Sequence, residues 1–289
     1  MRCACIDIGS NTTRLLVAER ADGRLREVVA ERAFTLLGAA GAVGHDKIGE
    51  VAVVVARQAG MAHELGAASL RVVATAAVRG AVDREALAAA IEAACGARLE
   101  ILDSRDEARL AFQGAIGMLV RCPPGPVGIV DVGGGSTELV VGTAEEGVTW
   151  SVSLPLGSSV VTHSEPFSDP PTVGELARVR AGLAARFAAV HAPQPAFAYA
   201  VGGSATSMQR LMGVALDPEA LARGLQALVT RPAAEVALRL GLHVERARLL
   251  PAGILLLDAA ARALGAPLQL AGGGLREGVV LEQLDALDA

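Results

Sequence analysis

The sequence predicts an α/β fold of two related domains with a cleft between them. The main support is a repeat. Segments 7–17 and 131–141 align without gaps and share Asp, Gly, Thr, Leu and Val at the first, third, seventh, ninth and eleventh places. In each half, three consecutive strands are expected before helices alternate with further strands, a pattern typical of α/β domains. Segment 122–126 (Cys-Pro-Pro-Gly-Pro) ends a helix and suits a linker. We therefore expect domains at 1–122 and 123–289, with the last helix free to pack on the first domain.

Apolar runs between turn residues define the expected elements in chain order. In the first half we expect strands at 2–7, 13–18, 24–32, 70–74 and 98–102, and helices at 47–65, 83–94 (capped by Asp83) and 105–119. In the second half we expect strands at 127–131, 137–141, 148–154, 197–201 and 268–271. The expected helices there are 173–190 (capped by the Asp-Pro-Pro-Thr segment 169–172), 218–228, 232–240, 245–264 and 276–284. Glycine turns are expected at 202–206 and 272–274.

Composition bounds the class of protein. Of the 289 residues, 52% are hydrophobic and 20% charged, so a buried core is expected and disorder is not. A net charge of −5 and a pI of about 5.6 argue against a nucleic-acid surface.

The longest charge-free run, 187–208, holds two prolines and a histidine, so no membrane span is expected. Asp7 interrupts any signal-peptide core, which favours a cytoplasmic protein. The four cysteines are too few for a disulfide scaffold, and Cys3 and Cys5 suit one face of a strand.

The two glycine-rich turns of the repeat are the candidate phosphate-binding loops. Glycine permits a tight turn and close approach to a ligand, and successive N–H groups beside hydroxyls form an anion cradle. The alternative is a pair of ordinary hairpin turns. Neither turn is a P-loop or a dinucleotide fingerprint, because no Lys-Ser/Thr follows and strands rather than helices come next. The candidate phosphate-binding residues are Gly9, Ser10, Asn11, Thr12, Gly133, Gly134, Gly135, Ser136 and Thr137.

Four acidic residues are candidates for metal binding or catalysis. Asp7 and Asp131 end the strands before the turns, where carboxylate oxygens can hold a hard divalent cation. Glu138 follows the second loop and could orient a water, although a solvated strand edge explains it equally. Glu107 has two interpretations that spacing leaves open. Segment 104–107 (Ser-Arg-Asp-Glu) fits a capping box, and a glutamate at a domain crossing suits a general base.

Arg79 follows an expected strand, where a loop lining a cleft would lie. It is a candidate phosphate-binding residue, and its alternative is a plain surface charge. The five histidines are scattered without metal-ligand spacing.

With these residues identified, the chain resembles the exopolyphosphatase and guanosine pentaphosphate phosphatase (Ppx/GppA) family in its short two-domain form. The resemblance runs from Cys5 to about Leu281. Its most specific motifs are the 130–138 block (VDVGGGSTE) and the 273–278 block (GGLREG). It implies two actin-like (ASKHA, ribonuclease H-like) domains with an interdomain cleft. It also implies that Glu107 is the catalytic base, that Asp131 associates with Mg²⁺ or another divalent cation, and that Glu138 is a further acidic residue of the site.

Three departures from the family pattern concern positive charge and length. Where the family has Arg-Leu-Gly-Glu-Gly, segment 35–39 reads Thr-Leu-Leu-Gly-Ala, and no arginine follows the Leu-Pro-Leu-Gly turn that ends at Gly157. Larger members also append a helical domain that has no counterpart here.

The leading functional hypothesis is a phosphohydrolase of terminal phosphoanhydride bonds, acting on inorganic polyphosphate or guanosine pentaphosphate by in-line attack of water. The alternative is a non-hydrolysing (p)ppGpp-binding sensor. Retention of Glu107, Asp131 and Glu138 favours the enzyme. A kinase of the same superfold is a less favoured alternative, because no acceptor-binding residue can be assigned in this sequence. Substrate preference and whether the chain forms a homodimer stay open.

Overall fold

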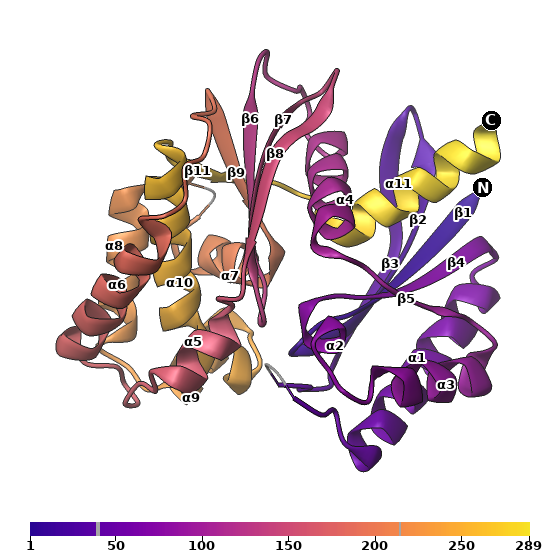
Figure 1. Ribbon diagram of the computed structural model, residues 1–289, viewed down its shortest axis with the longest axis horizontal. Coiled ribbons are helices and arrows are strands. Elements are labelled where there is room, and N and C mark those ends of the chain that lie inside the picture. Colours follow the sequence, from indigo (N-terminus) through magenta and orange to yellow (C-terminus); the bar gives the residue numbers. More distant parts are fainter. Residues whose placement is uncertain (39–40, 214) are drawn as a thin grey trace. The chain divides into compact units, whose positions relative to one another are not determined.

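Two mixed β-sheets organise the chain, one in each of two compact units (Figure 1). This computed structural model describes residues 1–38, 41–213 and 215–289. The first unit combines Met1–Val120 with Gly273–Ala289, and the second is Arg121–Gly272. The last helix therefore belongs to the unit that contains the first strand.

The first unit contains a five-stranded sheet in the order β3-β2-β1-β4-β5. Its strands are β1 (Arg2–Ile8), β2 (Thr12–Ala21), β3 (Arg24–Phe34), β4 (Ala67–Ala74) and β5 (Leu99–Ile101). Its helices are α1 (His45–Glu64), α2 (Ala76–Arg79), α3 (Arg84–Cys95), α4 (Ser104–Gly117) and α11 (Leu275–Asp288). Strands β1 to β3 are antiparallel, whereas β4 is parallel to β1 and β5 to β4.

The alternation of side chains along β1 separates two cores. Ala4, Ile6 and Ile8 pack with the apolar face of α1. Cys3 and Cys5 point the other way and pack with residues of α4 and α11. Both thiols are fully buried, which confirms the expectation that these cysteines act as small hydrophobic residues on one strand face.

The second unit repeats this design with one extra strand, in the order β10-β11-β9-β6-β7-β8. Its strands are β6 (Val127–Val132), β7 (Thr137–Thr143), β8 (Gly147–Leu154), β9 (Phe197–Val201), β10 (Ala215–Leu216) and β11 (Leu268–Leu270). Its helices are α5 (Ser158–Ser164), α6 (Val173–Phe187), α7 (Gly202–Met212), α8 (Pro218–Leu228), α9 (Ala233–Leu240) and α10 (Val244–Leu264). Strands β6 to β8 are antiparallel and β9 is parallel to β6, as in the first unit.

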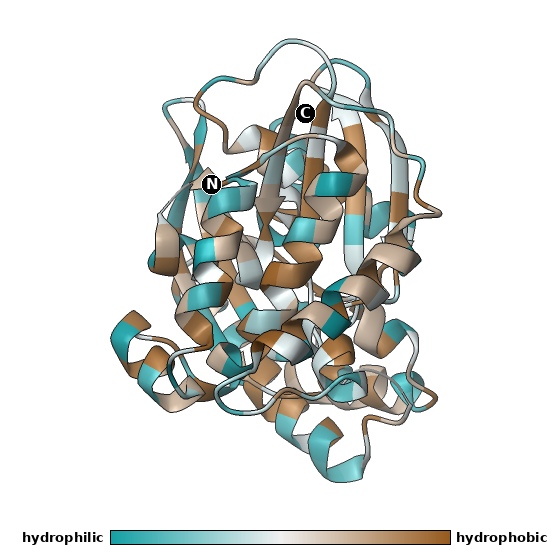
Figure 2. Cartoon of the chain, turned by 90° about the vertical axis from the view of Figure 1, so that its left-hand side faces the viewer, coloured by the Kyte–Doolittle hydropathy of each residue, from teal (hydrophilic) through white to brown (hydrophobic). Residues whose placement is uncertain are grey.

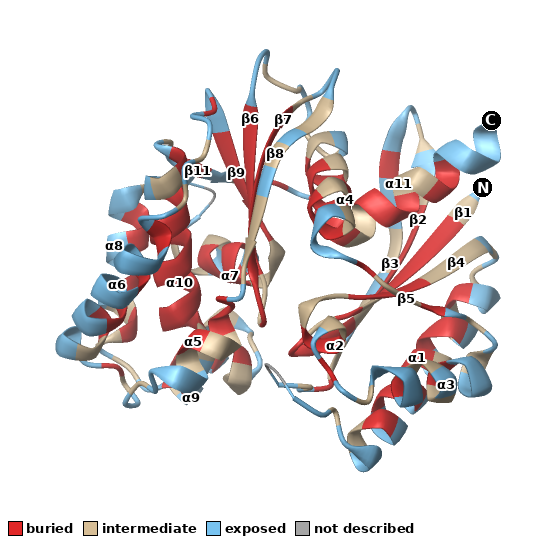
Figure 3. Cartoon of the chain, in the orientation of Figure 1, coloured by how far each residue is buried: buried red, intermediate tan, exposed pale blue. Residues whose placement is uncertain are grey.

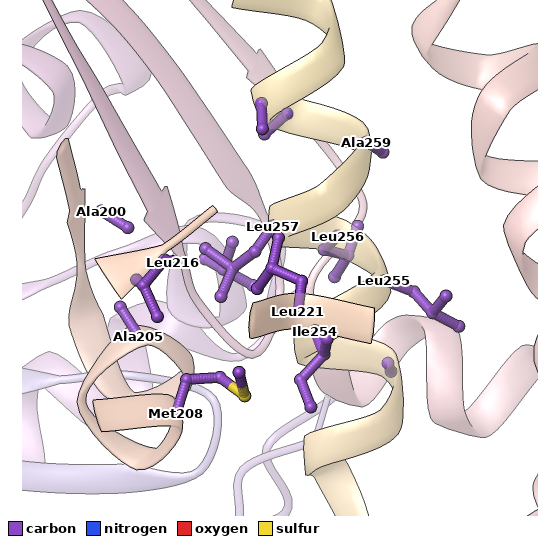
Figure 4. Close-up of a cluster of buried hydrophobic side chains, with 14 of the residues drawn as sticks. Ala200, Ala205, Met208, Leu216, Leu221, Ile254, Leu255, Leu256, Leu257 and Ala259 are labelled. Carbon is purple, nitrogen blue, oxygen red and sulfur yellow. The ribbon is translucent and has the colours of Figure 1, made fainter. Parts of the chain in front are cut away.

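Helix α10 is the centre of the second unit's core. Ile254 and Leu257 on this helix lie with Met208 of α7 and Leu221 of α8 (Figure 4). Buried residues run along the strands of each sheet (Figure 3). The helices carry both apolar and polar residues, as amphipathic helices do (Figure 2). In the part of the chain that the structure describes, no helix has the length and apolar character needed to cross a membrane.

The structure corrects the expected glycine turn at 202–206. These residues form the first turns of helix α7, which begins directly at the end of β9. Ser204, Ala205 and Met208 are buried, so packing of this face outweighs the weak helix preference of the glycines. The structure also adds the short elements α2, α5 and β10, and it ends α6 at Phe187 rather than at residue 190.

Glycines allow α4 and α11 to pack with their backbones in contact. A Cβ atom on Gly114 would lie 1.9 Å from the carbonyl oxygen of Gly274 and 2.5 Å from the amide nitrogen of Gly278. A Cβ on Gly117, one turn further along α4, would meet only the flexible end of Leu281.

We therefore expect Gly114→Ala to destabilise the protein, because the backbone of α11 must move away. Overpacking of this kind costs about 1–3 kcal/mol or more. The matched variant Gly117→Ala should be neutral or slightly stabilising, since alanine is the better helix former by about 1 kcal/mol. Thermal unfolding of both variants checks this. Equal melting temperatures for the two would contradict the close backbone packing.

Candidate active site

The two turns of the sequence repeat have the same internal hydrogen bond. In the first, the Gly9 amide donates to the Thr12 carbonyl oxygen at 3.0 Å. In the second, the Gly133 amide donates to the Ser136 carbonyl oxygen, also at 3.0 Å. These atoms occupy equivalent places in the aligned segments, so the repeat is a structural duplication of one strand-turn-strand unit.

In each unit, the segment after the third strand binds the carbonyl groups of the turn. The amide of Gly38 donates to Ser10 O at 3.2 Å, and those of Thr35 and Leu36 donate to Asn11 O at 3.1 Å. In the second unit, the amides of Ser158 and Ser159 donate to Gly133 O and Gly134 O at 2.9 and 3.0 Å.

This anchoring orients the peptide groups of both turns. In a planar trans peptide the N–H points opposite to the C=O. The amides of Asn11 and Thr12, and those of Gly134 and Gly135, are therefore directed away from the anchoring segments. Successive N–H groups with a common direction are what an anion-binding loop requires.

Buried threonines hold the turns in place. Thr137 is fully buried and its hydroxyl donates to the Leu156 carbonyl oxygen at 2.6 Å. The equivalent Thr13 is also fully buried and lies 3.1 Å, hydroxyl to hydroxyl, from Thr35. The Thr137 hydroxyl is therefore engaged with the protein backbone. Three further residues with hydroxyl groups, Ser10, Thr12 and Ser136, are buried within the turns themselves. A Cβ on Gly157 would lie 2.1 Å from Gly134 O, so only glycine fits beside the second turn.

The two copies differ in charge at one pair of positions. Asp7 pairs across the strands with Arg14, whereas Asp131 pairs with Glu138. Cross-strand partners have Cβ atoms about 4.5–5.5 Å apart, so their charges interact. The first copy therefore pairs a carboxylate with a guanidinium group, and the second copy pairs two carboxylates.

Asp7 has an environment that suits a ligand of positive charge. Its Oδ1 is buried and has no hydrogen-bond partner within the described ranges. Burial raises the pKa of this carboxyl, while the positive charges of Arg14 and Arg276 partly oppose that effect. Arg276 donates to Leu15 O of β2 at 3.3 Å and is brought there by helix α11. Sequence reasoning does not assign Arg276 to the site, although the 273–278 motif that contains it is a signal.

Asp131 and Glu138 supply the acidic pair of the second unit. Glu138 is 2% exposed and accepts a hydrogen bond from the Ser153 hydroxyl at 2.9 Å. Asp131 lies against the start of α7, where a Cβ on Gly202 would come within 2.4 Å of Asp131 Oδ1. Among the residues that the structure describes, no three His, Cys, Asp or Glu side chains gather as a metal cluster. The two carboxylates of Asp131 and Glu138 are the kind and number of protein ligands that Mg²⁺ takes, because this cation keeps several of its waters.

The structure excludes one of the two interpretations of Glu107, because the capping box is wrong. The N-cap of α4 is Asp103, one residue before the expected Ser104, and its Oδ1 accepts from the amides of Arg105 and Asp106 at 2.9 and 2.8 Å. Glu107 is 7% exposed, and its Oε2 lies 2.9 Å from Nη1 of Arg79. Arg79, expected to bind phosphate, is thus an ion-pair partner of Glu107 in this structure.

The departures from the family pattern have local structural consequences. Thr35 stands where the family pattern has an arginine. Its side chain is buried, and its hydroxyl is hydrogen-bonded to the hydroxyl of Thr13. Ser158 follows the Gly157 turn, and its hydroxyl donates to Gly133 O at 3.1 Å. Ala39 lies outside the described residues.

Comparison with known proteins assigns these features to one family. The model of the Ppx/GppA phosphatase family matches residues 8–287. The chain belongs to this family. Exopolyphosphatase 1 of Mycobacterium leprae is 30% identical over 99% of this chain and 90% of its own length. Exopolyphosphatase 2 of Mycobacterium tuberculosis is 35% identical over 62% of this chain and 59% of its own length.

A crystal structure confirms the expected fold class. The Aquifex aeolicus member of the Ppx/GppA family matches with a TM-score of 0.84 at 27% identity, covering 100% of this chain and 99% of that one. The fold is α/β with two sheets of the actin-like class, as the repeat and the family resemblance predicted.

Proposed function

We propose that this member of the Ppx/GppA family hydrolyses the terminal phosphoanhydride bond of inorganic polyphosphate or guanosine pentaphosphate. The observation that carries the proposal is the pair of anchored loops, each with two successive amides directed away from its anchor. The mycobacterial relatives named exopolyphosphatase support polyphosphate as the substrate.

Each loop supplies phosphate-binding donors in this proposal. The amides of Asn11 and Thr12, and those of Gly134 and Gly135, donate hydrogen bonds to non-bridging oxygens of the substrate. Preorganised donors of this kind stabilise the charge that spreads over the transferring phosphoryl group, which is the main demand of this reaction.

Glu107 is the general base of the proposed reaction. Its carboxylate accepts a proton from the water that attacks the terminal phosphorus in line with the leaving oxygen. Glu138 orients a water molecule in this proposal, and its own carboxylate is fixed by the Ser153 hydroxyl.

In this proposal Asp131, with Glu138 beside it, would hold a divalent cation, and Asp7 would supply the equivalent carboxylate of the first loop. When bound, such a cation neutralises negative charge on the phosphate oxygens. The paired carboxylates of the second copy make Asp131 the main ligand, because Asp7 already has the positive charges of Arg14 and Arg276 nearby.

Phosphate release by the purified protein tests this function. Polyphosphates of graded length, guanosine pentaphosphate and ATP should each be assayed with Mg²⁺. We expect release from polyphosphate or guanosine pentaphosphate well above that from ATP. Binding of guanosine pentaphosphate without release from any substrate would instead favour the sensor alternative.

A further inference from the structure

Arg79 connects Glu107 to the ends of two strands. It is the last residue of α2, the short helix directly after β4. Its Nη1 donates both to Glu107 Oε2 at 2.9 Å and to the Leu102 carbonyl oxygen at 2.7 Å. The Leu102 amide donates in turn to Ala74 O, the last residue of β4, at 3.0 Å. The guanidinium group is therefore fixed to backbone that the sheet itself holds.

The environment of Glu107 makes this partner important. The side chains of Glu107 and Arg79 are 10% and 27% exposed. A carboxylate with so little access to water is costly to ionise unless an opposite charge and a hydrogen bond compensate. A general base must be ionised and must also be held in a fixed orientation toward its water. Arg79 meets both needs at one carboxylate oxygen.

We infer that Arg79 is a positioning residue that acts on catalysis through Glu107, rather than a residue that binds the phosphate chain. This inference rests on the proposed role of Glu107 as general base. It predicts that the contribution of Arg79 appears in kcat and disappears once Glu107 can no longer accept a proton. A direct phosphate contact predicts the opposite, a loss of substrate binding whatever residue occupies position 107.

A double-mutant cycle with Arg79→Gln and Glu107→Gln separates these possibilities, with kcat and KM measured on polyphosphate. We expect Arg79→Gln to lower kcat by about tenfold to a hundredfold, the scale of coupling between contacting residues, with KM nearly unchanged. Arg79→Lys should recover part of this loss because it retains the charge. In the Glu107→Gln background, Arg79→Gln should cause no further loss of kcat, since residues that act as one unit are non-additive.

A binding measurement gives a readout besides activity. Calorimetric titration of polyphosphate into Glu107→Gln and into the double variant should give Kd values within about threefold, at the low end of the coupling range between contacting residues. Arg84→Gln is the matched control, because this neighbouring exposed arginine donates to the backbone oxygen of Arg79 and not to its guanidinium group. It should retain wild-type kcat and KM. Melting temperatures verify folding, and Arg79→Lys serves if Arg79→Gln is unstable.

The outcomes distinguish this inference from the proposed function. Wild-type protein without phosphatase activity would overturn the proposed function, whereas Glu107→Gln with full activity would overturn only the role of Glu107 as general base. If both controls behave as expected, but Arg79→Gln raises KM and Kd about tenfold in both backgrounds, Arg79 binds substrate and the positioning role is wrong.

Discussion

Glu107→Gln is expected to hydrolyse substrate at least about a hundredfold more slowly than the wild type, with little change in melting temperature. General-base catalysis contributes roughly 10²–10⁴-fold in rate, equivalent to about 3–5 kcal/mol of barrier. Glutamine keeps the shape of the side chain, and its carbonyl oxygen can still accept the hydrogen bond from Arg79. The loss should therefore appear in kcat, with KM nearly unchanged.

A neighbouring acid on the same helix provides the control. Asp106 has a side chain 51% exposed and pairs at the surface with Arg109. Asp106→Asn removes the same charge one residue away and should leave kcat unchanged. If Glu107→Gln keeps more than about a third of wild-type kcat, far above the general-base range, Glu107 has only a structural role.

Asp131→Asn is expected to remove most of the activity while leaving the fold intact. A divalent cation supplies several kcal/mol of charge stabilisation in phosphoryl transfer, so a loss of at least about tenfold is expected. The neutral amide oxygen of asparagine is a weaker ligand than a carboxylate. The variant should consequently need a higher Mg²⁺ concentration to reach half of its maximal rate, which a cation titration measures.

The matched control for Asp131 lies in the same unit, outside its strand. Glu145 is exposed in the turn between β7 and β8, so Glu145→Gln removes one negative charge from this unit without altering a candidate ligand. It should leave the Mg²⁺ requirement unchanged. Full wild-type activity in excess chelator would refute the metal requirement altogether, whatever the effect of Asp131→Asn.

The sequence alone determined the parts of the site that depend on local chemistry. Glycine and small polar residues between two apolar runs define a hairpin turn, and a short turn fixes the register of its strands. The gapless repeat therefore predicted both turns, and the structure adds the segments that anchor them. It also placed Arg14 and Glu138 at equivalent positions, which the structure shows opposite Asp7 and Asp131.

Only the tertiary structure decided the partners of Glu107 and Asp7. Spacing within 104–107 left a capping box and a general base equally open. In the structure the Leu102 amide is bonded to Ala74 O, and the helix begins at Ser104 after Asp103. The ion pair with Arg79 and the contact of Arg276 with β2 join residues far apart in sequence. Such pairings depend on how the strands and helices pack. No local propensity or spacing in the sequence encodes them, because their geometry exists only after the sheet and α11 have assembled.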